Sequence, residues 1–348
     1  MANKPTTPPR EQWIDALKGW GMLLIVVGHV WSLSDVPVWY VWMFSFHVPL
    51  FFFAAGLTLK ADSLPMSDFL RRRAQTLLVP YLIYALVGYV FYVLGYAAAE
   101  IAGKTVAQFS YGLWKPLAGV FYGSVGDGLL VNSPLWFLVA LFLSQGAVKA
   151  LNSDNRLSSA ARYAILLLLF MVAAVVEEQV NPPFSLLPAM GAAIFIQFGL
   201  TFRRHDTIHL WSKLQTWMAL LACLGVTLLS PFNGAVGLAG PTINHPALFL
   251  VFALAGIGFS VLMVRMLHAR WQAGLAFVGR HSMGILVLHM LAIKGVKVVL
   301  SIATGVSLDT MEHSLPWGLL VLMVAAVLMW PAIAIIERWL PWTLGMRR

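Results

Sequence analysis

Apolar residues recur along the whole chain in runs of about 17–25 residues, the length that a helix needs to cross a bilayer. Short polar segments separate the runs, and apolar and polar positions do not alternate within them as they would in barrel strands. The pattern predicts an all-α, polytopic integral membrane protein with about ten transmembrane helices. The ten predicted helices are centred on residues 18–34, 38–59, 76–98, 133–151, 162–178, 185–202, 214–231, 247–268, 281–302 and 315–337.

Composition excludes an ordinary soluble domain. Apolar residues make up 60 % of the chain and charged residues 11 %, with a mean hydropathy of +0.80, whereas a soluble domain carries about 25 % charge. No internal repeat or soluble insertion interrupts the runs, so we predict one membrane-embedded domain over residues 1–348, with an N-terminal tail at residues 1–12. The one cysteine, Cys223, lies in an apolar run, which excludes an intrachain disulfide and favours an inert, packed thiol over a nucleophile. The first run has no cleavage site at its end, so we expect it to stay as a span.

Lys and Arg decide the predicted orientation, because basic residues concentrate in cytoplasmic loops. With the N-terminus inside, 19 of the 23 basic residues fall on the cytoplasmic side, and both termini are cytoplasmic. The four exceptions are Lys104, Lys115, Lys294 and Lys297. Because the basic residues lie singly or in short groups between apolar runs, the net charge of +9 does not indicate a nucleic-acid partner. The outer loops 99–132 and 232–246 are rich in Gly, Asn, Ser and Pro and predict turns and short re-entrant pieces.

The first predicted helix carries a charged stripe. Asp15, Lys18, Met22, Ile25 and His29 follow one another at spacings of three or four residues, which places them on one helix face. His29 lies eleven residues after Lys18, or ~16 Å along a helix, which is near the middle of the hydrocarbon layer. His47 on the next helix reaches a similar depth, so the two imidazoles are predicted to meet. Imidazole titrates near neutrality and accepts a proton from a hydroxyl, which suits a general base. The alternative is that both are hydrogen-bonded packing residues.

The chain resembles the membrane acyltransferase 3 family, in particular its fucose 4-O-acetylase-like branch, over most of its length. Five motifs carry the resemblance in order. These are Arg10 with Trp13-Ile14-Asp15, Lys18-Gly19 and His29; Phe46-His47-Val48-Pro49-Leu50-Phe51-Phe52 with Gly56; Phe69-Leu70-Arg71-Arg72-Arg73 with Pro80-Tyr81; Trp136-Phe137; and Gly279, Ser282, Ile285 and His289. The sequence departs from the family pattern at Thr76, where a second Arg is expected, and at Ala55, where a Ser is expected.

The resemblance implies a ten-helix enzyme of a bacterial plasma (inner) membrane. It would take an acyl group, usually acetyl, from cytoplasmic acyl-CoA and pass it to a hydroxyl of an envelope glycan or a lipid-linked saccharide on the outer side. Arg10, Lys18, Arg72 and Arg73 are the residues that we expect to hold the CoA phosphates, since guanidinium groups bind phosphate in bidentate fashion. Membrane lipids are the other expected partners, and the oligomeric state stays open.

The mechanistic hypothesis assigns catalysis to His29, His47 and Asp15. His29 would deprotonate the acceptor hydroxyl or be acylated in passing, His47 would orient the thioester or act as a proton partner, and Asp15 would fix the basic residues beside it. The resemblance places Trp136 and His289 on the substrate side. From the residues alone, a core hydrogen bond is favoured over catalysis for His289.

No metal site is predicted. His205 and His209 have a spacing that binds metal on a helix, with Asp206 between them, but no third ligand is apparent and the adjacent arginines would repel a cation. Lys294 and Lys297 are expected to extend to the outer boundary, with contact to an anionic acceptor as the alternative.

Two other functions compete with acyl transfer. A proton-coupled transporter or flippase for an envelope precursor would also place ionisable residues at the midplane, although the chain shows no repeated half. If the protein were a non-catalytic scaffold, neither His29 nor His47 would be needed for any phenotype.

Overall fold

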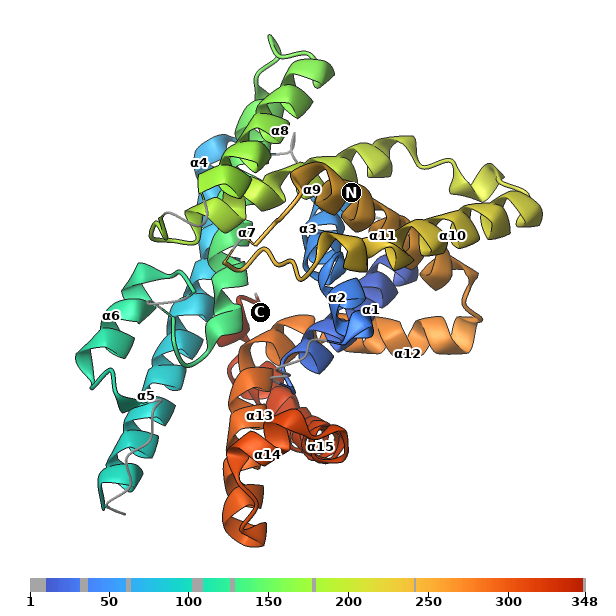
Figure 1. The fold of residues 1–348 in the computed structure, drawn as a ribbon. Helices are drawn as coiled ribbons and strands as arrows, with labels where there is room; N and C mark the ends of the chain where they lie inside the picture. Colours follow the sequence, from blue (N-terminus) through green and yellow to red (C-terminus); the bar gives the residue numbers. More distant parts are fainter. Residues whose placement is uncertain are drawn as a thin grey trace, which may run out of the picture.

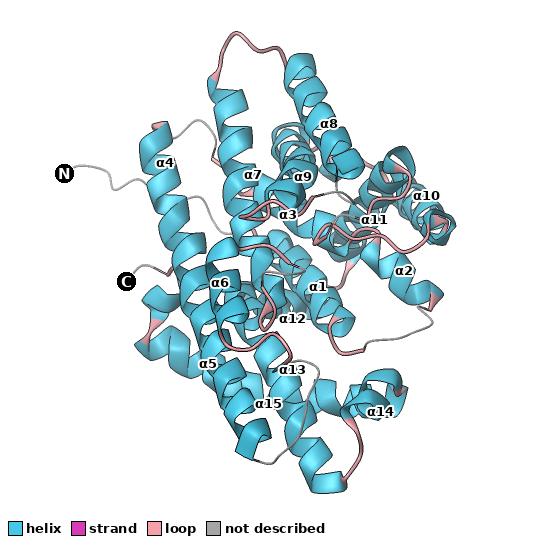
Figure 2. Cartoon of the chain, turned by 60° about the vertical axis from the view of Figure 1, so that its left-hand side comes forward, coloured by secondary structure: helices cyan, strands magenta, loops and turns pink. Residues whose placement is uncertain are grey.

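A computed structural model describes residues 11–31, 37–60, 64–101, 109–125, 129–176, 180–240 and 242–346, which fold almost entirely into helices (Figure 2). The longer helices are α1 (Gln12–Gly28), α5 (Val79–Ile101), α7 (Trp136–Ser153), α8 (Ser159–Val176), α9 (Leu186–His205), α10 (Lys213–Leu228), α11 (Pro246–Met266), α13 (Ser282–Thr304) and α15 (Leu315–Trp339). The shorter ones are α2 (Val38–Phe44), α3 (His47–Leu57), α4 (Met66–Arg73), α6 (Trp114–Tyr122), α12 (Ala269–Arg280) and α14 (Leu308–His313). Single turns lie at η1 (Ala74–Leu78, a π-helix), η3 (Ser133–Leu135), η4 (Ile208–Leu210), η5 (Ser230–Asn233) and η6 (Pro341–Leu344).

The predicted class is confirmed. Within the described ranges, nine helical segments are long and apolar enough to cross a membrane. They overlap nine of the ranges predicted from hydropathy, and α1, which has 17 residues and is not among the nine, overlaps the first predicted range. No strand occurs in these ranges, where the one β-bridge pairs Gly237 with Thr242.

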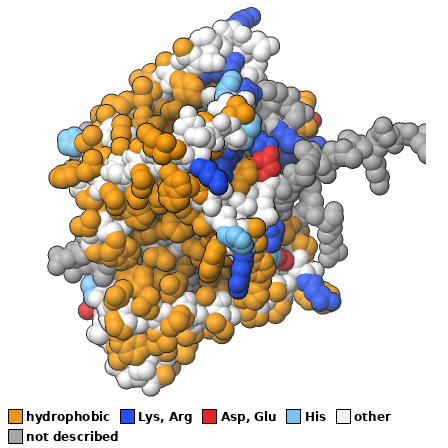
Figure 3. All heavy atoms as spheres, turned by 90° about the vertical axis from the view of Figure 1, so that its right-hand side faces the viewer, with side chains coloured by type: hydrophobic (Ala, Val, Ile, Leu, Met, Phe, Trp, Pro, Cys, Tyr) orange, Lys and Arg blue, Asp and Glu red, His pale blue; other side chains and the backbone are white. Residues whose placement is uncertain are grey.

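The helices form a buried centre and a lipid-facing periphery (Figure 1). The segment Val38–Leu57, α7 and α9 are mostly buried inside the molecule, whereas α8, α10 and α15 bury less than a quarter of their apolar windows. The side chains that these outer helices expose are largely apolar, and Figure 3 shows such side chains covering most of one face of the molecule. A continuous apolar surface of this extent fits hydrocarbon rather than water.

The first helix departs from its predicted range. It begins at Gln12 and ends at Gly28, rather than covering 18–34, and residues 32–36 lie outside the described part. The early start has a packing reason, since Ile14 to Leu17 are buried and α1 packs along α12. The two helices cross at Gly19 and Gly279, where a Cβ on either glycine would overlap a backbone carbonyl of the other helix. Glycine therefore permits this close crossing, as small residues do in membrane helix pairs.

The second predicted helix, 38–59, is broken rather than continuous. α2 ends at Phe44 and α3 begins at His47, with Phe46 at φ −141° and ψ −19° between them. The Phe46 ring is fully buried against Gly256 of α11, where any side chain would overlap it. Pro49 lies in the first turn of α3, a position where its missing N–H costs no helical hydrogen bond. The break places His47 at the start of a helix.

Ion pairs and hydrogen bonds join helix ends on two opposite sides of the molecule. On one side, Glu11 bonds to Arg203 and Asp206 bonds to Arg265, whose guanidinium also lies 4.0 Å from the Trp13 ring centre. On the other side, the Trp31 indole donates to the carbonyl of Ser314 at 3.1 Å. The first side is the one predicted to be cytoplasmic. Which side faces the cytoplasm stays a prediction.

The two carboxylates on the predicted cytoplasmic side are stabilised in their charged forms. The hydrogen bond from Arg203 lowers the pKa of Glu11 against an opposing effect of burial. Burial alone would raise the pKa of Asp206, but its hydrogen bond to Arg265 and the charge of that group outweigh burial and lower it. Both pairs therefore contribute to stability at neutral pH.

Candidate functional site

Three histidines from different helices lie near one another in the interior. His29 caps the C-terminal end of α1, His47 begins α3, and His289 lies two turns into α13. The rings of His29 and His289 meet edge to face, with 5.1 Å between their centres. The His47 ring contacts the ring of Phe44, which also packs against Gly28, the residue before His29. The three imidazoles thus form a cluster that we call the histidine site.

The predicted pairing within this cluster is only partly realised. The sequence predicts a contact between His29 and His47, whereas the ring that contacts His29 belongs to His289. The His47 ring instead contacts Phe44 at 4.5 Å, because the break between α2 and α3 turns it toward its own chain. His289 is fully buried, and its Nε2 has no hydrogen-bond partner in the described ranges.

The backbone fixes the tautomer of each imidazole. Nδ1 of His29 lies 2.7 Å from the carbonyl oxygen of Ile25, and Nδ1 of His47 lies 2.9 Å from that of Met43. His289 makes the same contact to its own helix through Nδ1. A carbonyl oxygen only accepts, so in the neutral ring Nδ1 carries the hydrogen and Nε2 holds the lone pair. Every member of the histidine site therefore offers Nε2 as a proton acceptor.

Asp15 lies far from the imidazoles. It is buried on α1, fourteen residues before His29, which is ~21 Å along a helix. At that separation the Asp15 carboxylate does not contact His29 or a group that reacts there. Its predicted role of fixing nearby basic residues stays a prediction.

A cavity of about 180 Å³, which we call the inner cavity, opens between α1, α3, α7, α13 and the α4–η1 segment. Its polar lining residues are Lys18, Thr58, Arg73, Gln145 and Ser282. Its apolar lining residues are Met22, Phe51, Ala55, Leu77, Phe137, Leu138, Leu141, Met283 and Leu286. A charged and polar region thus adjoins a hydrocarbon-lined region in one space.

Two of the four predicted phosphate-binding residues line this cavity. Lys18 and Arg73 belong to the lining, whereas Arg72 is exposed and does not. Arg10 lies outside the described residues. One departure from the family pattern also lies here, since Ala55 is a lining residue. Thr76 lies in the π-helix next to Arg73 and donates its hydroxyl to the carbonyl of Arg72 at 3.1 Å.

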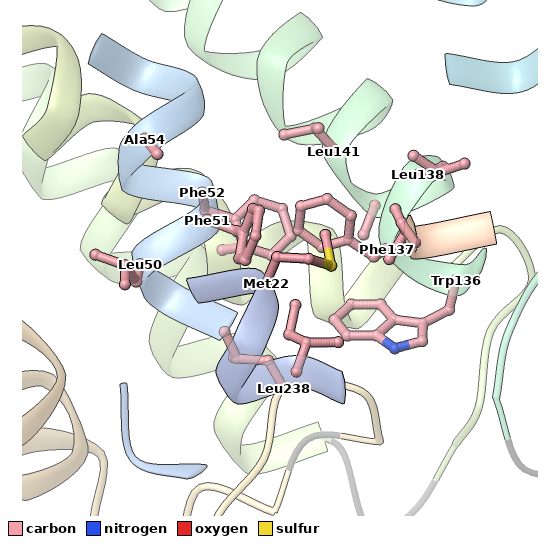
Figure 4. Packing of buried hydrophobic residues seen from close by; sticks show 14 of the residues in the cluster. Met22, Leu50, Phe51, Phe52, Ala54, Trp136, Phe137, Leu138, Leu141 and Leu238 are labelled. Atoms are coloured by element: carbon pink, nitrogen blue, oxygen red, sulfur yellow. The ribbon is translucent and has the colours of Figure 1, made fainter. Parts of the chain in front are cut away.

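The inner cavity approaches the histidine site without reaching it. Leu286 lines the cavity one helical turn before His289 on α13, and Met22 lines it two turns before His29 on α1. No histidine belongs to the lining. Figure 4 shows Met22 close to the aromatic rings at the apolar end, where Phe51 and Phe137 meet at 5.8 Å between ring centres. The cavity lining therefore ends one helical turn before His289 on α13.

Of the two predicted substrate-side residues, His289 belongs to the histidine site, and Trp136 lies directly before the cavity-lining Phe137. Trp136 is buried at the start of α7, with its indole packed among the core side chains of Figure 4. Asn132 just before it donates to the carbonyl of Val287 at 3.0 Å, and its own Oδ1 is buried without a partner among the described residues. Lys294 donates to the carbonyl of Val131 at 2.9 Å, so it holds the segment before α7 rather than extending freely to the boundary.

Sequence reasoning missed two polar residues of this region. Gln145 interrupts the apolar run of α7, and that interruption is the signal that could have found it. Asn132 gave no such signal because it lies in a loop already rich in polar residues. The candidate metal ligand Asp206 bonds to Arg265, and no group of three ligand residues gathers in the described ranges.

Comparison with family models matches residues 11–336 to an acyltransferase domain. No curated protein matches the chain, and no solved structure does. The match covers both the inner cavity and the histidine site. The chain therefore belongs to the acyltransferase 3 family and is a multi-pass membrane acyltransferase.

Proposed function

We propose that this protein is an O-acyltransferase of a bacterial plasma membrane. It would move an acyl group, usually acetyl, from cytoplasmic acyl-CoA to a hydroxyl of an envelope glycan or lipid-linked saccharide. Family membership supports the reaction class. The observation that supports acyl-CoA as the donor is the inner cavity. Its polar end holds Lys18 and Arg73, and its apolar end lies one helical turn from His289.

The donor fits the polarity of the inner cavity. Lys18 and Arg73 lie where the anionic phosphates of a CoA thioester would need cationic partners. The apolar end suits a small acyl group, since Met22, Phe51 and Phe137 narrow it. His289 lies one helical turn beyond Leu286, which lines this apolar end.

The chemistry proposed for the histidine site is general-base catalysis. Nε2 of His29 takes the proton of the acceptor hydroxyl, and the oxygen of that hydroxyl attacks the carbonyl carbon of the thioester. The new C–O bond forms, the C–S bond breaks, and the imidazolium returns the proton to the departing thiolate. The His289 ring lies beside the charge that forms on His29, and the hydrogen bond from Nδ1 to the carbonyl of Ile25 stabilises that charge.

The acceptor would approach from the side opposite to the inner cavity. Asn132 lies four residues before the start of α7, and Lys294 lies five residues after His289, in the middle of α13. Their contacts to Val287 and Val131 hold the segment before α7 against α13, which would give the acceptor a fixed wall.

Incubation of membranes with radiolabelled acetyl-CoA tests the proposal. We expect protein-dependent label on envelope material, and mass spectrometry of the glycan with and without the chain would identify the acylated residue. Accumulation of a solute driven by a pH gradient, with no dependence on acetyl-CoA, would contradict the proposal and favour a transporter.

A further inference from the structure

One buried polar group in the lining of the inner cavity has no role in the proposed function. Gln145 is 3 % exposed, and its Oε1 is buried with no hydrogen-bond partner in the described ranges. Leaving a buried acceptor unpaired is destabilising, so native proteins rarely do so without a reason. Since the side chain lines the cavity, a ligand in that space can supply the missing donor.

The position of Gln145 along the cavity limits what this ligand group can be. Leu138, Leu141 and Gln145 form one stripe of α7, at helical spacings of three and four, and all three line the cavity. Gln145 lies seven residues from Leu138, so it is ~10 Å from the apolar end along the helix. It therefore faces a part of the ligand that lies ~10 Å from an acyl group at that end.

The other helices show the same gradient. On α1 the lining changes from Lys18 to Met22, and on α13 it changes from Ser282 to Leu286. The polar residues lie together at one end, with the cation Arg73 among them. A ligand that fits carries anionic charge at one end, an N–H donor along its length and a small apolar group at the other end.

We infer that Gln145 accepts a hydrogen bond from an amide N–H of the pantetheine arm of the donor thioester, and so positions that arm in the inner cavity. This inference rests on the proposed function, because it assumes a pantetheine thioester as donor. Gln145 would be a residue that positions the donor, although it is uncharged and belongs to none of the sequence motifs described above. Gln145 would bind the arm itself, whereas Lys18 and Arg73 would bind the phosphates of the CoA.

A pair of donor analogues isolates the N–H. S-acetylpantetheine is compared with two analogues in which one or the other amide N–H is replaced by an ester oxygen. These analogues keep the length and the acyl group. Binding to the purified protein in nanodiscs is measured by calorimetry, which needs no turnover. We expect the wild type to bind one of the two analogues about tenfold more weakly than S-acetylpantetheine, the usual loss for one buried hydrogen bond.

Variants at Gln145 then assign the preference. Gln145→Leu keeps the volume but removes the acceptor, so the tenfold preference should disappear, whereas Gln145→Glu keeps an acceptor and should keep the preference. Ser144→Ala is the matched control, because the Ser144 hydroxyl donates to the carbonyls of Ala140 and Ala189 and does not line the cavity. This variant should bind all the compounds as the wild type does.

The outcomes separate the two proposals. Equal binding of all three compounds by the wild type, or a preference that persists in Gln145→Leu, would overturn the role of Gln145 while leaving acyl transfer intact. Absence of acyl transfer from acetyl-CoA in the membrane assay would instead overturn the proposed function. A preference that only Gln145→Leu abolishes would support the inference.

Discussion

The nitrogen that each histidine presents is set by its own backbone. Because Nδ1 of His29 is bound to Ile25, protonation at Nε2 leaves that hydrogen bond intact and even strengthens it. A ring held in this way can gain and lose a proton without turning. The charge that appears on it is offset by a carbonyl dipole rather than by a carboxylate.

Replacing His29 by Gln tests the general base. Gln keeps a polar side chain near Ile25 but offers no proton acceptor of suitable basicity, so turnover should fall by about 10²–10⁴-fold. His245→Gln, an exposed histidine of an outer loop, is the control and should leave turnover unchanged. Initial rates of acetyl transfer in purified, folded protein provide the measurement. Normal turnover in His29→Gln would refute the assignment.

Substitutions at Arg73 and Arg72 distinguish a specific contact with the donor from a general effect of positive surface charge. Both were predicted to bind phosphate, but only Arg73 lines the inner cavity. Arg73→Ala should raise the KM for acetyl-CoA by about tenfold or more, since a hydrogen bond to a charged group contributes about 1.5–3 kcal/mol. Arg72→Ala should change it little. Equal effects of the two substitutions would mean that the cavity does not hold the phosphates.

The residues of the site differ in how far the sequence could predict them. His29 and His47 stood out because ionisable side chains in apolar runs are costly. The contact between His29 and His289 joins helices at opposite ends of the chain, and no local pattern encodes such a contact. The separation of Arg73 from Arg72 depends on the angle at which the π-helix presents them, and the sequence does not show that angle.

At the scale of elements, the crossing of α1 and α12 positions the charged end of the inner cavity. Lys18 lies next to Gly19, and the backbone of Gly19 touches α12. A larger residue at the crossing would therefore push α1 away and displace Lys18 with it. The cavity and the crossing are parts of one packing arrangement.

Gly19→Ala tests the crossing. The added Cβ would overlap the carbonyl of Leu275, and neither backbone can move locally to avoid it. The free energy of unfolding should therefore fall by about 1–3 kcal/mol. Gly274→Ala on α12 is the control, because no atom lies within 4 Å of the added Cβ and Ala favours a helix by about 0.8–1.0 kcal/mol. Thermal unfolding in detergent should show opposite shifts. A Gly19→Ala protein as stable as the wild type would contradict the close crossing.

The pair of Asp206 and Arg265 gives a pH-dependent prediction. The folded-state pKa of Asp206 is lowered, so the pair contributes its full stability above the ordinary carboxylate pKa of about 4 and loses it as the pH falls through the lowered value. Asp206→Asn should therefore cost about 1–3 kcal/mol at pH 7, since both side chains are largely buried. The melting curves of variant and wild type should converge as the pH falls below 4. A constant difference at all pH values would rule out the charge as its cause.

The sequence predicts helices by the length and period of apolar runs, and this explains which elements it placed well. The runs of α7, α9 and α11 end in polar residues, so their bounds follow from hydropathy. The break before His47 leaves hydropathy unchanged and is marked only by Pro49 two residues later. The early start of α1 depends on α12, a short helix that supplies a packing surface and no span of its own.

On the scale of the whole molecule, the buried helices separate two approaches to one site. The inner cavity lies below the histidines, and Asn132 and Lys294 lie beyond them. The peripheral helices α8, α10 and α15 add lipid-facing surface and contribute nothing to the cavity lining. This arrangement suits a transferase whose two substrates come from opposite sides of a membrane, provided that the cavity faces the cytoplasm.

Orientation is therefore the property on which this view of the molecule depends, and cysteine labelling can measure it. Cys223→Ala removes the native thiol, after which single cysteines replace Asn155 between α7 and α8 or Thr304 at the end of α13, both exposed. On intact cells a membrane-impermeant maleimide should label Thr304→Cys and not Asn155→Cys, because the basic residues place the α7–α8 loop inside. Inverted membrane vesicles should give the reverse pattern. If Asn155→Cys were labelled from outside, Lys18 and Arg73 would face away from cytoplasmic acyl-CoA, and the donor would have to come from the other side.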